Sequence, residues 1–569
     1  MRRILFLAVF LLLATQVSAQ GMLITNSQDW TDVYSVELFG NLMDIDSKFL
    51  TGTRHATILH YSLPDTELEV ISSDDNPIAV GYDQILQGQG FGDVEESTYN
   101  NVNLELARRL QGIDDFIIVD DSYGYNALAV APFASRADYY VLFADDRNIA
   151  SVGSYLGSID VDNIIIYGQV DREVKDELAQ YNPETINEGD RFQNNIEIVK
   201  KYLEINPTKQ VILTNGEFIE QSLMDGYNPV MFIGRTNVPD PIRDFIQQSD
   251  IEIGILVGNE LIGTATIIRR QIGISVFVKF AQGARTPGGA IAAVEDLDRF
   301  PMPSYQLNFG IISAYYNQAS GNLEVTYRNN AEIATYFKST INIYSGDQLQ
   351  VVGDDTAVFI DGEEFKTILY EVDLLEGENA SAEFFTIFGE STNALEFSLE
   401  QTMAIEFVEV MDDSEINVTG MYYDAGEQAF YIEVRNVGYV DAYVDAEILE
   451  VWINGELVTV GGDEVLLVEP GKKGKVKASV ELAEEDIANA RNQDLEVKVY
   501  YGERENALIK MQRATFAFEL QEADYTLYIL IAVVLVLFFL ILWKRRKKKE
   551  KEENNINVDV NNNINNRNS

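Results

Sequence analysis

A short pattern recurs three times, at almost equal spacing, in the first half of the chain. It stands at residues 23–27 (LITNS), 117–121 (IIVDD) and 212–216 (ILTNG), which are steps of 94 and 95 residues. Each copy reads as an apolar strand that ends in small or polar residues, and nine residues after its start each copy enters a helix-like stretch. An internal repeat of this kind makes each copy one structural unit that packs against its neighbours.

Further strand patterns follow inside each copy. The second strand is expected at residues 57–60, 140–144 and 230–234, and a third strand ending on Gly at residues 78–81, 164–168 and 253–258. Continuous apolar strands that alternate with helical patterns are typical of parallel sheets covered on both faces. We therefore predict three tandem α/β modules with parallel sheets, at residues 21–112, 113–207 and 208–285.

The second half repeats with a different period. Tyr315-Tyr316 returns as Tyr422-Tyr423 and Arg328-Asn329 as Arg435-Asn436, both 107 residues later, whereas Gly389-Glu390 returns as Gly502-Glu503 after 113 residues. The intervening strands alternate apolar and polar residues, which marks half-buried strands. Two immunoglobulin-like β-sandwiches are expected, at residues 304–410 and 411–520, after a linker at residues 286–303.

The two ends of the chain predict its topology. Arg2 and Arg3, an apolar run and a small-residue cleavage site predict an export signal at residues 1–19. Residues 525–543 form an apolar stretch long enough for one transmembrane helix, and basic residues follow it at once. We expect a cell-membrane protein with an extracellular ectodomain, one membrane helix, and a basic then Asn-rich cytoplasmic tail at residues 544–569.

The middle copy of the first repeat carries a family resemblance. Residues 125–132 (YNALAVAP) are similar to the "DALA" helix of the cell-wall-binding repeat, type 2, and residues 164–168 and 189–195 (GDRFQNN) resemble later elements of that family. Asn126 replaces the family's Asp, which Asp32 keeps in the first copy, and the third copy lacks a counterpart of 189–195. The resemblance implies a prokaryotic surface protein whose modules bind anionic envelope polymers.

The second repeat carries a shorter resemblance. Residues 435–438 (RNVG) are similar to a strand end of cell-adhesion-related immunoglobulin-like domains in prokaryotic surface proteins. The resemblance implies an adhesion or surface role for this half of the chain.

The composition limits the partners. The net formal charge is −49 over 569 residues, and 10 of the 42 basic residues lie in residues 1–19 and 544–569, so the region between is more acidic still. This charge argues against nucleic acid, and against simple electrostatic capture of an anionic polymer. It suits an acidic outer surface with diffuse binding of divalent cations, and we expect no cofactor. There is no Cys, so the exported part must be stable without disulfides.

Few residues suggest catalysis. The only histidines are His55 and His60, without a Cys or an H-E-x-x-H pattern beside them, and no G-x-S-x-G motif occurs. We therefore predict neither a metal site nor a catalytic residue.

Candidate binding residues follow the strand ends and the family-like stretch. The carboxyl ends of parallel strands are where open α/β sheets place ligands, although the same small polar residues also cap helices. Arg191 would contact ligand, or alternatively brace a module interface. The candidate binding residues are Asp32, Asp120, Asp121, Asn126, Gly189, Asp190, Arg191 and Asn215, and the candidate glycosylation acceptors are Asn379 and Asn417.

These observations favour a non-catalytic, membrane-anchored surface protein. Its three-module head would contact wall polymer, a surface-layer lattice or a neighbouring surface protein. Two alternatives stay open. One is an envelope-glycan hydrolase that uses carboxylates and so needs no histidine. The other is a surface receptor that binds a solute between modules.

Overall fold

The structure is a computed structural model that describes residues 21–258, 261–279, 299–304, 306–346, 348–374, 380–453, 456–491 and 493–521. The predicted export signal, membrane helix and tail, most of the predicted linker, and Asn379 lie outside these ranges. Within them, no helix is both long and apolar enough to cross a membrane. The chain divides into two compact units, residues 1–411 and 412–569.

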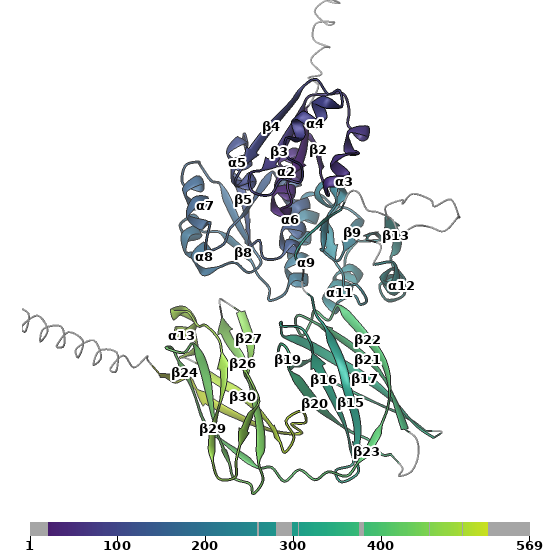
Figure 1. Cartoon of the computed structure of the whole chain (residues 1–569), viewed down its shortest axis with the longest axis vertical. Helices are drawn as coiled ribbons and strands as arrows, with labels where there is room; N and C mark the ends of the chain where they lie inside the picture. The colour runs from purple at the N-terminus through teal and green to yellow at the C-terminus, as the bar shows by residue number, and fades with distance from the viewer. Residues whose placement is uncertain are drawn as a thin grey trace, which may run out of the picture. The chain divides into compact units, whose positions relative to one another are not determined.

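Three parallel four-stranded sheets form the first half of the chain, as the repeat predicts (Figure 1). All three have the same strand order: the second strand, then the first, third and fourth of each sheet. The first sheet contains β1 (Met22–Asn26), β2 (Asp46–Phe49), β3 (Leu68–Ser73) and β4 (Val94–Tyr99). The second contains β5 (Asp115–Val119), β6 (Tyr139–Phe143), β7 (Asn163–Tyr167) and β8 (Glu184–Ile186). The third contains β9 (Gln210–Thr214), β11 (Val230–Phe232), β12 (Ile253–Val257) and β13 (Ser275–Lys279).

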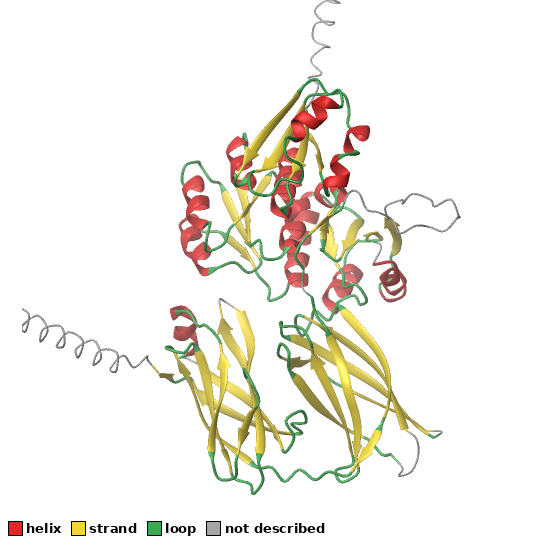
Figure 2. Ribbon diagram, viewed as in Figure 1, coloured by secondary structure: helices red, strands yellow, loops and turns green. Residues whose placement is uncertain are grey.

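Helices cover these sheets (Figure 2). The first module has α2 (Trp30–Met43), α3 (Thr53–Ala56), η1 (Leu59–Ser62), α4 (Tyr82–Gly88) and α5 (Val102–Arg109). The second has α6 (Gly124–Ala137), α7 (Ile149–Leu156), α8 (Arg172–Leu178), η2 (Ala179–Tyr181) and α9 (Arg191–Ile205). The third has α10 (Gln221–Met224), α11 (Asp240–Gln248) and α12 (Ile262–Gln271).

Two strand predictions for the first module are wrong. Residues 57–60 lie in the turn after α3 and in η1, whereas the second strand is β2. That strand is at the sheet edge and pairs only with β1, so its DSKF sequence needs no continuous apolar run. Residues 78–81 lead into α4, where Gly81 is the N-cap with a φ of 64°. The third strand is β3, which lies between β1 and β4.

The three modules share one hydrophobic core. Buried apolar side chains from all three sheets form a single cluster, and α2, α6 and α10 contact one another. Hydrogen bonds also join the modules at these helices. The Tyr34 hydroxyl donates to the carbonyl oxygen of Ala127 over 2.8 Å, and the side-chain amide of Asn41 donates to the carbonyl oxygen of Met224 over 2.7 Å. The modules therefore form one fused body, because each buries its helices against the others.

The end of the predicted linker belongs to this body. β14 (Phe300–Pro301) pairs with β10 (Phe218–Ile219) in an antiparallel ladder. Phe300 and Met302 are buried in the shared core. A Cβ atom added to Gly124 would lie 2.6 Å from the Cβ of Met302, so this glycine permits the close approach.

Two β-sandwiches follow, each built from two sheets. In the first, one sheet has the order β20-β16-β15-β23 and the other the order β18-β17-β21-β22, with β19 paired to β17. Its strands are β15 (Phe309–Asn317), β16 (Asn322–Asn329), β17 (Thr335–Ser345), β18 (Gln348–Gly353), β19 (Val358–Ile360), β20 (Phe365–Glu371), β21 (Ala380–Gly389), β22 (Phe397–Ala404) and β23 (Glu406–Val408). Side chains from both sheets meet in one core.

The second sandwich repeats this topology, with sheets β29-β25-β24-β32 and β27-β26-β30-β31 and with β28 paired to β26. Its elements are β24 (Ile416–Asp424), β25 (Ala429–Asn436), β26 (Ala442–Ile453), β27 (Glu456–Gly461), β28 (Leu466–Val468), β29 (Lys473–Ser479), α13 (Glu484–Ala490), β30 (Asp494–Gly502), β31 (Lys510–Ala517) and β32 (Leu520–Gln521). It has its own core, separate from that of the first sandwich. Residues 323–327 and 430–434, which alternate apolar and polar residues, lie in β16 and β25. β25 is half-buried as expected, whereas residues 323–327 of β16 are all buried, because Glu324 and Thr326 on its other face hydrogen-bond Asn317 and Thr367.

The duplicated Arg-Asn pair explains part of this likeness. Asn329 and Asn436 are each fully buried at the end of a strand. The side-chain amide of Asn329 donates to two backbone carbonyl oxygens, at 2.7 and 3.0 Å, and that of Asn436 donates to two at 2.7 and 2.8 Å. Each side-chain oxygen also accepts a backbone N–H two residues later. The same residue thus pairs the backbone of the same turn in both sandwiches.

Candidate functional site

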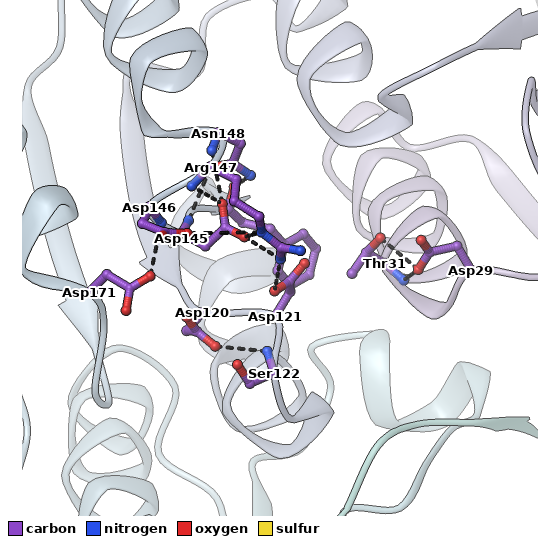
Figure 3. Close-up of polar contacts among 11 residues, drawn as sticks. Asp29, Thr31, Asp120, Asp121, Ser122, Asp145, Asp146, Arg147, Asn148 and Asp171 are labelled. Carbon is purple, nitrogen blue, oxygen red and sulfur yellow. Dashed lines mark hydrogen bonds and ion pairs between the residues drawn. The ribbon is translucent and has the colours of Figure 1, made fainter. Parts of the chain in front are cut away.

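An acidic edge lies at the carboxyl ends of β5 and β6. Asp120 and Asp121 follow β5, and Asp145 and Asp146 follow β6, so the parallel arrangement of these strands brings the two pairs together (Figure 3). We call the group of Asp29, Asp120, Asp121, Asp145, Asp146 and Asp171 the acidic edge. Asp29, at the start of α2, brings the first module into it.

Most contacts of the acidic edge are hydrogen bonds from backbone N–H groups that close turns or cap helices. Asp120 accepts a hydrogen bond from the Ser122 backbone N–H at 2.8 Å, and Asp29 accepts one from that of Thr31 at 2.9 Å. Arg147 pairs with Asp145 and lies 3.9 Å from Asp121. Partial burial, together with the nearby carboxylates, raises the pKa of Asp121.

The acidic edge does not form a metal centre by geometry. Within the described ranges, no group of three or more His, Asp or Glu side chains is placed to hold a metal ion. The edge is a concentrated negative surface, suited to a cationic partner surface or to loosely held cations.

The predicted residues Asp32, Asn126 and Asn215 are buried near the strand ends. Asp32 is 8% exposed and accepts a hydrogen bond from the Ser27 hydroxyl over 2.7 Å, and burial raises its pKa to about 7. Asn126 packs against Gly168, where an added Cβ would lie 2.7 Å from the Asn126 amide nitrogen. Asn215 is 7% exposed, and neither polar atom of its side chain has a hydrogen-bond partner. These three residues are internal to the head, unlike Asp120 and Asp121.

The Gly189 to Arg191 stretch forms part of a junction with the first sandwich. Gly189 has a φ of 89°, and the Asp190 side chain caps α9 by accepting two backbone N–H bonds of 2.9 Å. The Arg191 guanidinium lies 2.9 Å from Glu396 and 3.5 Å from Glu390. The sandwich occupies the guanidinium, so Arg191 braces the head against the first sandwich rather than one module against another.

The junction is buried and aromatic on its other side. Arg191 lies over the rings of Tyr125 and Phe192, 5.1 and 4.8 Å from their centres. The side chains of Arg191 and Glu396 are 9% and 1% exposed. Burial, together with the negative charges of Glu390 and Asp190, raises the pKa of Glu396 to about 8. The positive charge of Arg191 acts in the opposite direction.

A second loop of the head reinforces this junction. The Asn237 side-chain amide donates to the Leu395 carbonyl oxygen over 2.6 Å, and its backbone N–H donates to that of Glu396 over 3.1 Å. The Ser398 backbone N–H donates to the Thr236 hydroxyl over 2.8 Å. The head and the first sandwich thus share a polar interface made by two loops of the head.

The histidines have separate surroundings. His55 is 7% exposed, and its Nδ1 accepts a hydrogen bond from the Thr51 backbone N–H at 3.2 Å. His60 packs against Tyr61, with ring centres 3.9 Å apart and ring planes inclined by 39°. Asn417, the described glycosylation candidate, is exposed on β24.

One feature escaped the sequence reasoning. Glu37 lies in the middle of α2, is 2% exposed, and lines a polar cavity of about 640 Å³ among the three modules. The only available signal was the repeat itself, since the 94- and 95-residue steps place Ala131 and Gly226 at the equivalent positions.

Comparison with known proteins leaves the family open. No protein-family profile and no curated protein matches the chain. Among solved structures, Cwp6 from Clostridium difficile is similar over 45% of this chain and 44% of its own, with 13% identity and a TM-score of 0.38. A protein of unknown function from Porphyromonas gingivalis W83 is similar over 38% of this chain and 99% of its own, with 10% identity and a TM-score of 0.15. At these scores neither likeness carries an argument about function, which must come from the chain's own residues.

Proposed function

We propose that this chain is a non-catalytic, membrane-anchored surface protein whose three-module head contacts the cell envelope. The observation that carries the proposal is the fused head, which has one shared core and is joined to a β-sandwich by the Arg191 junction. Such a body presents a fixed surface, as a binding module must. The order of elements along the chain agrees: export signal, head, sandwiches, then the predicted membrane helix.

The resemblance of residues 125–132 and 189–195 to the cell-wall-binding repeat supports an envelope role. The charge directs the choice of partner. The acidic edge would repel an anionic polymer unless cations bridge the two, whereas a basic protein surface would bind it directly. The proposed contact is therefore to a neighbouring surface protein, or to wall polymer through divalent cations.

A co-sedimentation experiment tests this proposal. The purified full-length chain in mild detergent is mixed with isolated envelope, with Ca²⁺ or with a chelator, and bound protein is measured in the pellet. We expect binding that decreases at high salt, because the contact is electrostatic. Neutralising the acidic edge with Asp120→Asn, Asp121→Asn and Asp146→Asn should weaken it by about tenfold.

The matched control is Asp160→Asn with Asp162→Asn. These exposed carboxylates precede β7, at the opposite end of the same sheet, and their loss should leave binding unchanged. Failure of the wild-type chain to sediment under either cation condition would overturn the proposal. Release of sugar from the envelope would instead favour the hydrolase alternative.

A further inference from the structure

A buried carboxyl group opens onto a cavity in the head. Glu37 is 2% exposed, and its Oε1 has no hydrogen-bond partner. The side chains of Ser47 and Gln221 hydrogen-bond the carboxyl group, and the Lys48 charge favours its ionised form, but Oε1 is left without a donor among the described residues. An unpaired buried acceptor opposes folding, so its presence needs a reason.

The repeat shows that the fold does not require this carboxyl. The equivalent position of α6 holds Ala131, which is uncharged and smaller than Glu; the next step of the repeat reaches Gly226, which lies just after α10 with a φ of 70°. Ala131 occupies its place in α6 fully buried. A buried carboxyl group that departs from its counterpart Ala131 and keeps one oxygen without a donor points to a function.

The cavity gathers residues from all three modules. The first contributes Asn41, Asp44, Asp46, Ser47 and Lys48 beside Glu37; the second contributes Ser135; the third contributes Glu220, Gln221, Ser222, Asp225, Tyr227 and Lys279. Lys279 is paired with Glu220 at 2.7 Å and also donates to the Ser222 hydroxyl. Carboxyl groups outnumber amino groups in the lining, so its charge favours a cationic ligand.

The uncharged lining narrows the ligand further. The hydroxyls of Ser47, Ser135 and Ser222 and the amides of Asn41 and Gln221 make the uncharged lining polar, as a ligand rich in hydroxyl groups requires, although Asn41, Gln221 and Ser222 also donate to Met224, Ser47 and Glu220. Tyr227, 75% exposed, adds an aromatic surface. A volume of about 640 Å³ is in the range of small-molecule sites.

We propose that this cavity binds an amino sugar, with the Glu37 carboxylate paired to the ligand's ammonium group. The ammonium would supply the donor that Oε1 lacks. Burial raises the pKa of Glu37 to about 7, and a bound cation would favour its ionised form. The inference goes beyond the envelope contact and stands whether or not that contact exists. The amino sugar could be free or part of a glycan, since both present the same group.

Calorimetric titration of the full-length chain in detergent tests the site. The probes are glucosamine and N-acetylglucosamine, which differ in whether the nitrogen can carry charge. We expect glucosamine to bind at least about tenfold more tightly, because only its nitrogen can form the charge-assisted bond. Comparison with a partly deacetylated chitin oligomer separates the two sources: tighter binding of the oligomer indicates a glycan, equal binding a free sugar.

Variants assign the binding to Glu37. Glu37→Gln and Glu37→Ala, the latter copying Ala131, should each abolish the preference for glucosamine, whereas Asp160→Asn should not. Thermal unfolding checks that the variants are folded. Should they not fold, Tyr227→Ala at the exposed rim should still weaken glucosamine binding. Equal binding of the two sugars, no binding of either, or glucosamine binding that Glu37→Gln leaves intact would each overturn the proposal. Displacement of glucosamine by Ca²⁺ with equal loss of Ca²⁺ binding in Glu37→Gln would assign a metal site instead.

Discussion

In each sandwich the segment that follows β21 or β30, here called the corner, makes a different attachment. In the first, the segment that begins at Gly389 and Glu390 holds Arg191 of the head. In the second, the repeated Gly502 and Glu503 hold the start of their own unit: the Asp413 backbone N–H donates to a Glu503 carboxylate oxygen over 2.5 Å. A duplicated corner thus attaches a separate domain in one copy and a local segment in the other.

The difference rests on one buried position. Glu396 of the first sandwich is replaced after 113 residues by Ile509 in the second. Glu396 is fully buried opposite Arg191, whereas Ile509 is partly exposed. A buried carboxylate is tolerated only with a partner. The departure from the repeat therefore marks an interface, just as Glu37 marks a cavity among the three modules.

The largest expected effect comes from removing the charge that Glu396 faces. Arg191→Met should destabilise the first unit by about 3–5 kcal/mol at pH 9, where buried Glu396 is ionised and loses its partner, and by less near neutral pH, where Glu396 holds a proton. Adding Glu396→Ile, which copies Ile509, should recover most of that loss, since apolar replacement of a buried pair is often neutral. Urea unfolding followed by hydrogen exchange in peptides of each unit measures both effects.

Lys200→Met is the matched control for this substitution, because Lys200 is an exposed cation on the same helix. It should cost less than about 1 kcal/mol. An Arg191→Met variant as stable as the wild-type chain would show that the junction contributes nothing to the first unit.

A smaller effect is expected where the two sandwiches agree. Asn329→Ala and Asn436→Ala should each cost about 1–3 kcal/mol, because each leaves buried backbone groups unpaired. Hydrogen exchange of β16 and β25 should report similar losses. Asn417→Ala, on an exposed site, is the control. A large loss in one sandwich alone would break the proposed equivalence of the two turns.

The repeats explain how much of this could be predicted. Continuous apolar strands predicted the parallel sheets, and alternating strands predicted β16 and β25. The first module was predicted less well, because β2 at the sheet edge lacks an apolar run and Gly81 caps a helix rather than ending a strand. Asp120 and Asp121 do lie at the carboxyl end of β5, as predicted, where both are half-buried.

The partners of buried charges could not be predicted. Arg191 and Glu396 are 205 residues apart in the sequence, and no local pattern pairs them. Glu37 reads as an ordinary polar residue of a helix until the fold shows that residues 32–40 of α2 are all buried. What the sequence does contain is the mismatch with the repeat, at Ala131 and Gly226 for Glu37 and at Ile509 for Glu396. Such mismatches become interpretable once the copies can be superposed.

The smallest expected effect is on the pH dependence of the unfolding free energy, which should differ between the two sandwiches. The pKa of Glu396 is raised from 4.5 to about 8, so the unfolded chain ionises this group before the folded chain does. Its contribution to stability is then fully present below about pH 4.5 and is lost as the pH rises through about 8, at no more than about 1.4 kcal/mol per pH unit. Asp32 and Glu37, both with a pKa of about 7, add to the same window.

The contribution of Glu396 is therefore obtained by comparing the wild-type chain with Glu396→Gln. The unfolding free energy of the first unit is measured in urea from pH 5 to 9, and the difference between the two slopes against pH belongs to Glu396. We expect the variant to have the shallower slope, because glutamine cannot ionise. Ile509 occupies the equivalent position in the second unit and cannot titrate, so Ile509→Val there should leave the pH dependence of that unit unchanged. Equal slopes in Glu396→Gln and the wild-type chain would mean that Arg191 keeps Glu396 ionised throughout. The junction would then be a simple ion pair, without the proton that its three carboxyl groups require.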